Sequence, residues 1–238
     1  MKISVILPAY NCMDYVSAAL DSVWAQSVAV DELICVNDAS TDNTLAFLQG
    51  DSRLTVITHP ENRGPAVARN TALAAATGDI IALIDGDDLW PEGKLAAQVA
   101  SLSADEKIGI SAGYTERFYS PDSVPTDTPP SPYFNAHLGS FLIRKAVFDE
   151  VGVFDPDLRK SEDQDWFLRA REHGVGINIL PRITLRYRLH PHSMTHGDNA
   201  DQLGLTKVMQ RALRRRRQTG RPPPPPLSIP PLQALRSG

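Results

Sequence analysis

The sequence predicts an α/β fold, with a mostly parallel sheet covered by helices on both faces and a smaller mixed region after it. Short apolar, β-branched runs alternate with helix-forming runs through the first 105 residues, as in parallel sheets with crossover helices. The alternation then stops, and a strand-like segment and a Pro-rich loop follow. With 238 residues, 42% of them hydrophobic, the chain can bury a globular core.

The first part of the chain is expected to contain four strands alternating with three helices. Each strand is a short apolar run. The helices carry start signals, namely Asn11 with Asp14 in a capping-box-like spacing, Ser40 or Thr41 as a cap, and Pro65 near N1. The expected strands are 3–7, 32–38, 54–60 and 79–85, and the expected helices run from about 11 to 26, 40 to 49, and 64 to Gly78.

The second part is expected to be mixed. Residues 108–120 predict a strand that leaves the parallel pattern, 121–133 a Pro-rich loop, and 137–155 a strand, a short helix and a turn. A helix over 161–174, strands at 176–180 and 184–190, and a helix within 198–217 complete the expected elements. The Pro-rich residues 218–238 are expected to form a poorly ordered tail with polyproline character.

Bulk properties exclude several classes of protein. A net charge of −4 argues against a nucleic-acid binder. Cys12 and Cys35 have no metal-ligand spacing, and so few thiols favour a reducing cytoplasm. The apolar run before Pro8 is too short for a signal peptide, and no segment approaches the ~20 apolar residues of a spanning helix. We therefore expect any membrane association to be peripheral.

Four polar loops follow the four expected strands and should share one rim of the sheet, where open parallel sheets bind ligands. They read PAYN, NDASTD, PENRG and DGDD. Neither G-x-G-x-x-G nor G-x-x-x-x-G-K-[ST] occurs, which argues against a dinucleotide-binding domain and a P-loop. Asp38 can accept a hydrogen bond from a base or a ribose, or it can be an ordinary turn or cap residue.

The DGDD loop places three carboxylates within four positions: Asp85, Asp87 and Asp88. Carboxylates that close repel one another, so a hard cation is one explanation and a solvated turn before Pro91 is the other. An EF-hand fails, because Leu89, Trp90 and Ala96 stand where an oxygen donor, a glycine and a glutamate are needed. Trp90 directly after the turn favours partial enclosure.

The segment SEDQDW has two interpretations. Ser161 and Gln164 have the spacing of a capping box, and Glu162 and Asp163 suit the positive end of a helix dipole. Catalysis by Asp163 would instead need burial or a neighbouring carboxylate to raise its pKa. Spacing alone favours the cap.

Two basic features lie towards the end of the chain. Residues 185–196 hold Arg186 and Arg188 followed by three histidines, of which His190 ends a strand-like run and could face a metal or a phosphate; the others are His192 and His196. A cluster of arginines further on could contact anionic lipid or be simply solvated, and it comprises Arg211, Arg214, Arg215, Arg216 and Arg217.

Taken in order, these motifs resemble the inverting family 2 glycosyltransferases. The resemblance covers roughly residues 1–195 and rests on SVILPAYN, VNDASTDNT, NRGPAVARN, IALIDGDD, VGVFD and SEDQDW. It implies the GT-A fold, which has a Rossmann-like sheet, with a nucleotide-sugar-binding half at 1–105 and an acceptor-binding, catalytic half at 106–197. It also implies a nucleotide-sugar donor, usually a UDP-sugar, a divalent cation such as Mn²⁺ or Mg²⁺, and a role in polysaccharide or glycoconjugate biosynthesis.

The same resemblance assigns roles to residues of the nucleotide site. The turn of Pro8, Ala9 and Tyr10 would line the pocket, with Tyr10 near the base. Asp38 would bind the base, Arg69 would approach the nucleotide or its phosphates, and Asp85 would lie near the ribose. Asn37 stands where many relatives have an acid, which we expect to alter nucleotide contacts but no catalytic role.

The resemblance also assigns the metal ligands and the catalytic base. Asp87 would ligate the cation, with His190 as a further ligand found in some relatives. Asp163 would be the catalytic base that deprotonates an acceptor hydroxyl. Supporting roles fall to Asp88, Glu162 and Arg188.

Two alternative functions stay open. A nucleotidyltransferase would share the sheet and the metal, but we would expect a Gly-rich, basic loop after the first strand, where this chain has PAYNCMDY. A non-catalytic binding module on the same fold is opposed by the presence of Asp38, Asp85, Asp87 and Asp163 together. The acceptor is a glycan, a lipid-linked saccharide or another hydroxyl compound, and the sequence carries no code for it.

Overall fold

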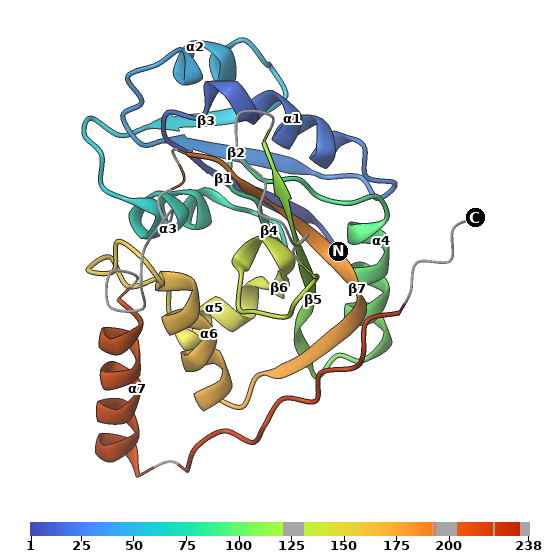
Figure 1. The fold of residues 1–238 in the computed structure, drawn as a ribbon, viewed down its shortest axis with the longest axis vertical. Coiled ribbons are helices and arrows are strands. Elements are labelled where there is room, and N and C mark those ends of the chain that lie inside the picture. The colour runs from blue at the N-terminus through green and yellow to red at the C-terminus, as the bar shows by residue number, and fades with distance from the viewer. Residues whose placement is uncertain (121–130, 192, 194–203, 221, 234–238) are drawn as a thin grey trace.

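A computed structural model describes residues 1–120, 131–191, 193, 204–220 and 222–233. A seven-stranded mixed sheet in the order β3-β2-β1-β4-β6-β5-β7 forms its centre (Figure 1). The strands are β1 (Ile3–Ala9), β2 (Glu32–Asn37), β3 (Leu54–Thr58), β4 (Ile80–Leu83), β5 (Ile108–Tyr119), β6 (Leu142–Arg144) and β7 (Gly176–Leu189).

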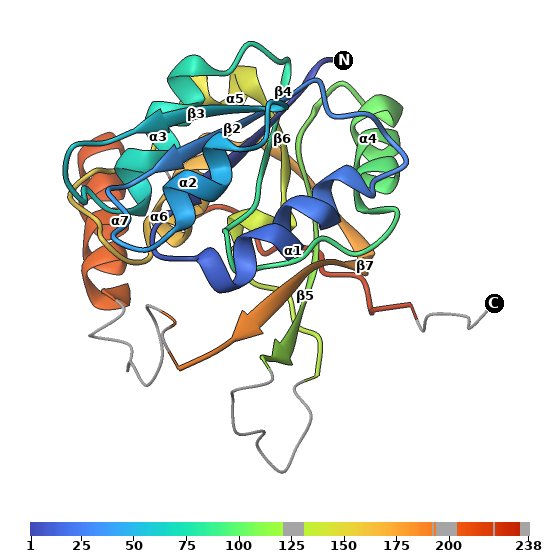
Figure 2. The ribbon, with the colours of Figure 1, turned by 90° about the horizontal axis from the view of Figure 1, so that it is seen from above.

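Helices cover both faces of this sheet, as the alternation predicts. Their bounds are α1 (Met13–Trp24), α2 (Thr44–Gln49), α3 (Pro65–Ala75), α4 (Lys94–Ala104), the short 3₁₀ helix η1 (Leu138–Ser140), α5 (Lys145–Val151), α6 (Glu162–Glu172) and α7 (Leu205–Thr219). Alternate residues of β1 point to opposite faces. Ile6 packs in one core with α3, α5 and α6, whereas Val5 and Leu7 pack in another with α1, α2 and α4 (Figure 2).

The strand order places the polar loops together. β1 pairs in parallel with β2 on one side and with β4 on the other. The strand order therefore reverses at β1, and the loops after β1 and β4 meet at the position where open α/β sheets bind ligands. β6 lies between β4 and β5 and is antiparallel to both, while β7 runs parallel to β5.

One strand replaces two that the sequence predicts. The runs 176–180 and 184–190 belong to a single strand, β7, which passes through Pro181. Because β7 lies at the edge of the sheet, a proline without an N–H is tolerated there. A register shift between the pairs Ala112–Ile179 and Tyr114–Ile183 absorbs the irregularity.

The predicted side-chain caps of α1 and α2 are wrong, because the capping side chains hydrogen-bond to a neighbouring loop instead. Asn11 has a φ of 47° and accepts a hydrogen bond from Thr41 N–H at 2.8 Å, so it links two loops instead of capping α1. Ser40 accepts from Asn11 N–H at 3.1 Å and does not cap α2. Asp42, from the loop after β2, accepts from Met13 N–H at 3.2 Å and so serves the first turn of α1. Two helices also end early, α1 at Trp24 and α3 at Ala75.

The C-terminal segment also differs from the sequence prediction. Residues 222–233 lie along the fold and not apart from it (Figure 1). Tyr114 donates to the Pro230 carbonyl at 2.6 Å, Gln233 N–H donates to the Pro181 carbonyl at 2.9 Å, and Leu227 packs against the core. The segment therefore covers part of the β7 edge, which would otherwise expose unpaired backbone groups.

Some predictions concern residues outside the described part of the chain. They are most of the Pro-rich loop, the first residues of 198–217, His192 and His196. Within the described residues, no helix is long and apolar enough to cross a bilayer.

Candidate active site

Asp38 holds the loops of the predicted nucleotide pocket in place. It is 3% exposed at the end of β2. Its carboxylate accepts hydrogen bonds from Arg63 N–H at 3.0 Å, Gly64 N–H at 2.7 Å and the His59 ring at 2.7 Å. Both oxygens are therefore engaged with the loop between β3 and α3, which begins at Pro65 as N1. Contact between Asp38 and a base stays a prediction, and His59 is a partner that sequence reasoning missed.

The turn after β1 leaves an aromatic side chain at the rim. Ala9 is buried, whereas Tyr10 is 49% exposed. An aromatic ring face that is open to solvent can stack on a base. The position of Tyr10 is compatible with the predicted role, and Pro8 lies half-buried beside it.

Arg69 joins the DGDD loop to the helix that carries Asp163. Its guanidinium is buried and donates to Asp85 Oδ1 at 2.5 Å and to Glu162 Oε1. Burial alone would raise the pKa of Asp85, but the Arg69 charge lowers it below its usual value. Burial raises the pKa of Glu162, with Arg69 opposing. Arg69, predicted to approach phosphates, is thus already engaged by two carboxylates.

The DGDD loop is enclosed, which argues against the solvated-turn interpretation. Trp90 is 4% exposed and Asp88 is fully buried. A Cβ at Gly86 would lie 2.7 Å from Cys12 Sγ, so only glycine fits between the loop and α1. Asp88 Oδ1 accepts from Arg188 N–H at 2.9 Å, whereas its Oδ2 has no hydrogen-bond partner among the described residues. Burial, followed by the charges of Asp87 and Asp85, raises the pKa of Asp88 well above its usual value.

Asp87 lies against His190, and the resemblance to family 2 proposes both as metal ligands. His190 Nε2 lies 3.0 Å from Asp87 Oδ2, and the ring packs on Tyr15 of α1 at 4.5 Å between centroids. Two ligands of an octahedral cation lie about 3 Å apart when each is about 2.1 Å from the metal. Asp87 Oδ2 and His190 Nε2 therefore fit a divalent cation. Arg188 Nε donates to the Asp87 carbonyl at 2.7 Å and holds the loop against β7.

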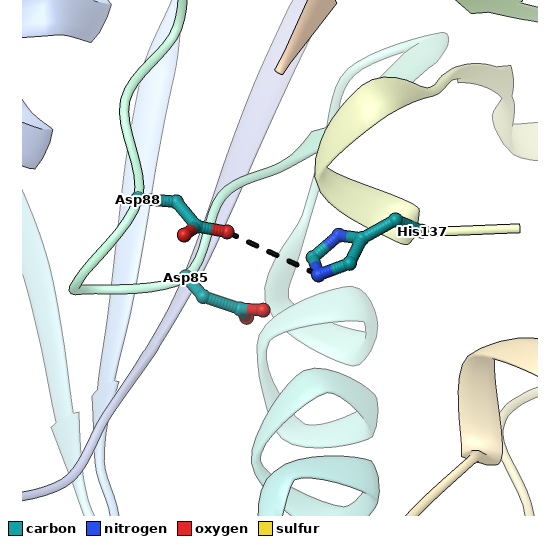
Figure 3. Close-up of side chains that lie close together, drawn as sticks. All are labelled: Asp85, Asp88 and His137. Carbon is teal, nitrogen blue, oxygen red and sulfur yellow. Dashed lines mark ion pairs between the residues drawn. The ribbon is translucent and has the colours of Figure 1, made fainter. Parts of the chain in front are cut away.

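A second candidate group surrounds His137, which sequence reasoning missed. Ligand atoms of Asp85, Asp88 and His137 lie within 4.8 Å of one another, and His137 Nε2 is 4.0 Å from Asp88 Oδ2 (Figure 3). Burial lowers the pKa of His137, so its ring is neutral. Its Nδ1 accepts from Gly139 N–H at 3.3 Å, which leaves the ring proton on Nε2, facing the carboxylates. His137 therefore fits a hydrogen-bond donor better than a metal ligand. No spacing in the sequence connects it to the DGDD loop.

Asp163 has the environment of a general base. It lies in the first turn of α6, and its Oδ1 accepts from Gln164 N–H at 2.7 Å. Burial, and then the neighbouring Glu162 charge, raise the pKa of Asp163 to about 7, with Arg69 opposing. Ser161 makes no side-chain cap and adopts a φ of 58°, a strained backbone for serine. The capping-box interpretation is therefore wrong for this turn.

Comparisons with known proteins show which family this chain belongs to. The family model described as Glycosyl transferase family 2 matches residues 4–159, and the chain belongs to that family. It is 39% identical over 206 residues to the putative teichuronic acid biosynthesis glycosyltransferase TuaG of Bacillus subtilis (strain 168), with 81% of each chain covered. It is 29% identical over 202 residues to WfaP of Escherichia coli, a UDP-Glc:alpha-D-GlcNAc-diphosphoundecaprenol beta-1,3-glucosyltransferase, covering 81% of this chain and 79% of WfaP.

Solved structures show the same fold. Residues 1–349 of TarS from S. aureus, in complex with UDP-GlcNAc, match with a TM-score of 0.72 at 23% identity, covering 89% of this chain and 65% of that one. The mannosyltransferase PcManGT from Pyrobaculum calidifontis, in complex with GDP-Man and Mn²⁺, matches with a TM-score of 0.70 at 23% identity, covering 90% of this chain and 64% of that one. The predicted family and the GT-A fold are confirmed, and the protein is a glycosyltransferase.

Proposed function

We propose that this glycosyltransferase moves a sugar from a UDP-sugar to a hydroxyl of a lipid-linked saccharide, with inversion at the anomeric carbon, in the synthesis of a cell-surface polysaccharide or glycoconjugate. The observation that carries the proposal is a carboxyl group whose pKa is raised to about 7 beside the Arg69 cluster. UDP and the lipid-linked acceptor are supported by the activity named for WfaP, and UDP also by the TarS complex with UDP-GlcNAc.

The reaction we propose is a single displacement. Asp163 takes the proton of the acceptor hydroxyl as that oxygen forms a bond to the anomeric carbon. The bond from the anomeric carbon to the diphosphate oxygen breaks on the opposite face, and UDP leaves with the electron pair. A pKa near neutral suits this role, because about half of Asp163 is then ionised near pH 7 and the carboxylate is still basic enough to accept the proton.

The other residues of the site would position the donor and Asp163, and would hold the cation that neutralises the diphosphate. Arg69 holds Glu162 and Asp85 together, and so sets where Asp163 lies relative to the donor. Residues 1–105 would bind the nucleotide sugar, and 106–197 would complete the acceptor side. Asp87 and His190 would hold Mn²⁺ or Mg²⁺, which when bound neutralises charge on the diphosphate. We place the reaction at the cytoplasmic face of the membrane, where a peripheral enzyme can reach a lipid-linked acceptor.

The test is UDP release from a panel of UDP-sugars with Mn²⁺ and lipid-linked acceptors, with and without chelator. Asp163→Asn should abolish transfer and leave UDP binding within about threefold. Asp149→Asn, an exposed carboxylate on α5, is the matched control and should stay active. Full transfer by Asp163→Asn would remove Asp163 as the base. Nucleotide binding without transfer for any donor would favour a binding module, and pyrophosphate release from a nucleotide would favour a nucleotidyltransferase.

A further inference from the structure

Helix α7 has an inward face that is fastened to the catalytic helix α6. Val208 and Ala212 are buried, each 1% exposed. Arg215 donates to Asp165 at 2.8 Å and to Glu172 at 2.9 Å, two acids separated by two turns of α6. Arg211 pairs with Asp155 and Arg216 lies 3.9 Å from Glu172. Three of the five clustered arginines therefore serve packing, and Figures 1 and 2 both show α7 at the edge of the fold beside α6.

The outward face of α7 has a different composition. Met209 and Leu213 are 51% and 46% exposed and lie one turn apart, so they share a side of the helix. Beside them, three basic side chains are exposed and make no ion pair with a described residue: Lys207, Arg214 and Arg217. We call these five residues the outer face of α7.

We propose that the outer face of α7 docks on the surface of an anionic lipid bilayer. Its basic residues complement anionic headgroups, and its two apolar side chains can enter the boundary between headgroups and acyl chains. The protein as a whole carries a net charge of −4, so its attraction to such a surface must come from a local basic patch. A second copy of the chain is a poorer occupant, because its own Lys207, Arg214 and Arg217 would repel these.

Docking would have a consequence for the enzyme. Since Arg215 ties α7 to Asp165 on α6, the membrane-bound helix and the helix that carries Asp163 would move as one unit. The active site would then be held near the bilayer, where a lipid-linked acceptor resides. This goes beyond the proposed function, because binding to lipid can be measured without donor, acceptor or transfer.

The test is co-sedimentation of the full chain with vesicles of phosphatidylglycerol and phosphatidylcholine, compared with vesicles of phosphatidylcholine alone. We expect binding only to the anionic vesicles and its loss at high ionic strength. The triple variant Lys207→Gln, Arg214→Gln and Arg217→Gln should lower the partition coefficient about a hundredfold, because each basic residue near an anionic leaflet contributes about fivefold.

A matched variant distinguishes the effect of the basic residues on the outer face of α7 from the effect of the protein's net charge. Lys2→Gln, Arg53→Gln and Lys107→Gln remove the same charge from exposed positions elsewhere and should leave vesicle binding within about twofold. Met209→Gln with Leu213→Gln should weaken binding about tenfold, and circular dichroism should show all variants folded. Equal losses in the two charge variants, equal binding to neutral vesicles, or no vesicle binding would overturn the proposal. A dimer that dissociates in the Met209 and Leu213 variant would assign the face to self-association and overturn it too.

Discussion

Arg69 Nη2 on α3 donates to Asp85 Oδ1 after β4 across 2.5 Å, and the same guanidinium also binds Glu162 on α6. This contact joins the DGDD loop to α6, the helix that carries Asp163. The Glu162 side chain is 7% exposed and that of Asp85 is 27% exposed, so Glu162 depends more than Asp85 on the Arg69 charge for compensation.

Removing Arg69 should therefore be costly. In Arg69→Met, Glu162 stays buried and Asp85 half-buried without this positive partner, and breaking a buried pair such as Arg69–Glu162 costs about 3–5 kcal/mol. We expect urea unfolding to show a loss of that size. Arg69→Lys keeps the charge but cannot serve both carboxylates in one plane, so its loss should be smaller. A variant Arg69→Met as stable as the parent would show that this bridge contributes nothing to the fold.

The ionisation of Asp163 should govern activity. Because its pKa is about 7, kcat/KM should rise about tenfold per pH unit below that value and level off above it. Release of UDP measured between about pH 5 and pH 9 tests this. A profile with no break near neutrality would mean that another group accepts the proton. Asp149→Asn should reproduce the parent profile, since that side chain is exposed on α5.

The same ionisation should lower stability as pH rises. Asp163 holds its proton more tightly in the folded chain, with a pKa of about 7, than at the ordinary value of 3.8. Between those values the folded state binds more protons than the unfolded state, so the free energy of unfolding falls with pH, by at most about 1.4 kcal/mol per unit.

Asp163→Asn removes this ionisable group and should flatten the slope. Urea titrations at about pH 5 and pH 8 should then show the variant gaining stability over the parent at the higher pH. Equal slopes for variant and parent would show that Asp163 ionises normally in the folded chain. Stability gained by losing the base is expected where a site is organised for catalysis and not for folding.

The fold and the rim residues could be predicted because their signals are local. Apolar runs define the strands, and each polar motif directly follows a strand, so Asp38 and Asp87 were found from their own segments. The residues whose roles the sequence did not predict all depend on contacts with residues far away in the sequence. His137 approaches Asp88 only after η1 packs beside β4. Asn11 and Ser40 became links between loops because the carboxyl ends of β1 and β2 lie side by side.

The arginines of α7 also make contacts that depend on residues far away in the sequence. A run of basic residues looks uniform in sequence, yet a helix turns each residue about 100° from the one before it. Arg215 therefore meets Asp165 and Glu172, while Arg214 and Arg217 are exposed. Sequence alone could not say which acids would lie opposite, because Asp165 is 50 residues away from Arg215.

The last prediction is that, of the two histidines beside the DGDD loop, His190 and not His137 contributes to cation binding. His190 Nε2 lies 3.0 Å from Asp87 Oδ2 and fits a shared metal, whereas the Nε2 proton of His137 faces Asp88. In calorimetric titrations of Mn²⁺ with UDP present, His190→Ala should bind the metal at least about tenfold more weakly. His137→Ala should keep Mn²⁺ affinity within about threefold, because its ring offers a donor and not a lone pair. The reverse order would move the metal to Asp85, Asp88 and His137. Equal affinity in both variants and the parent would place it on neither histidine, and circular dichroism of each variant would show whether the loop keeps its fold.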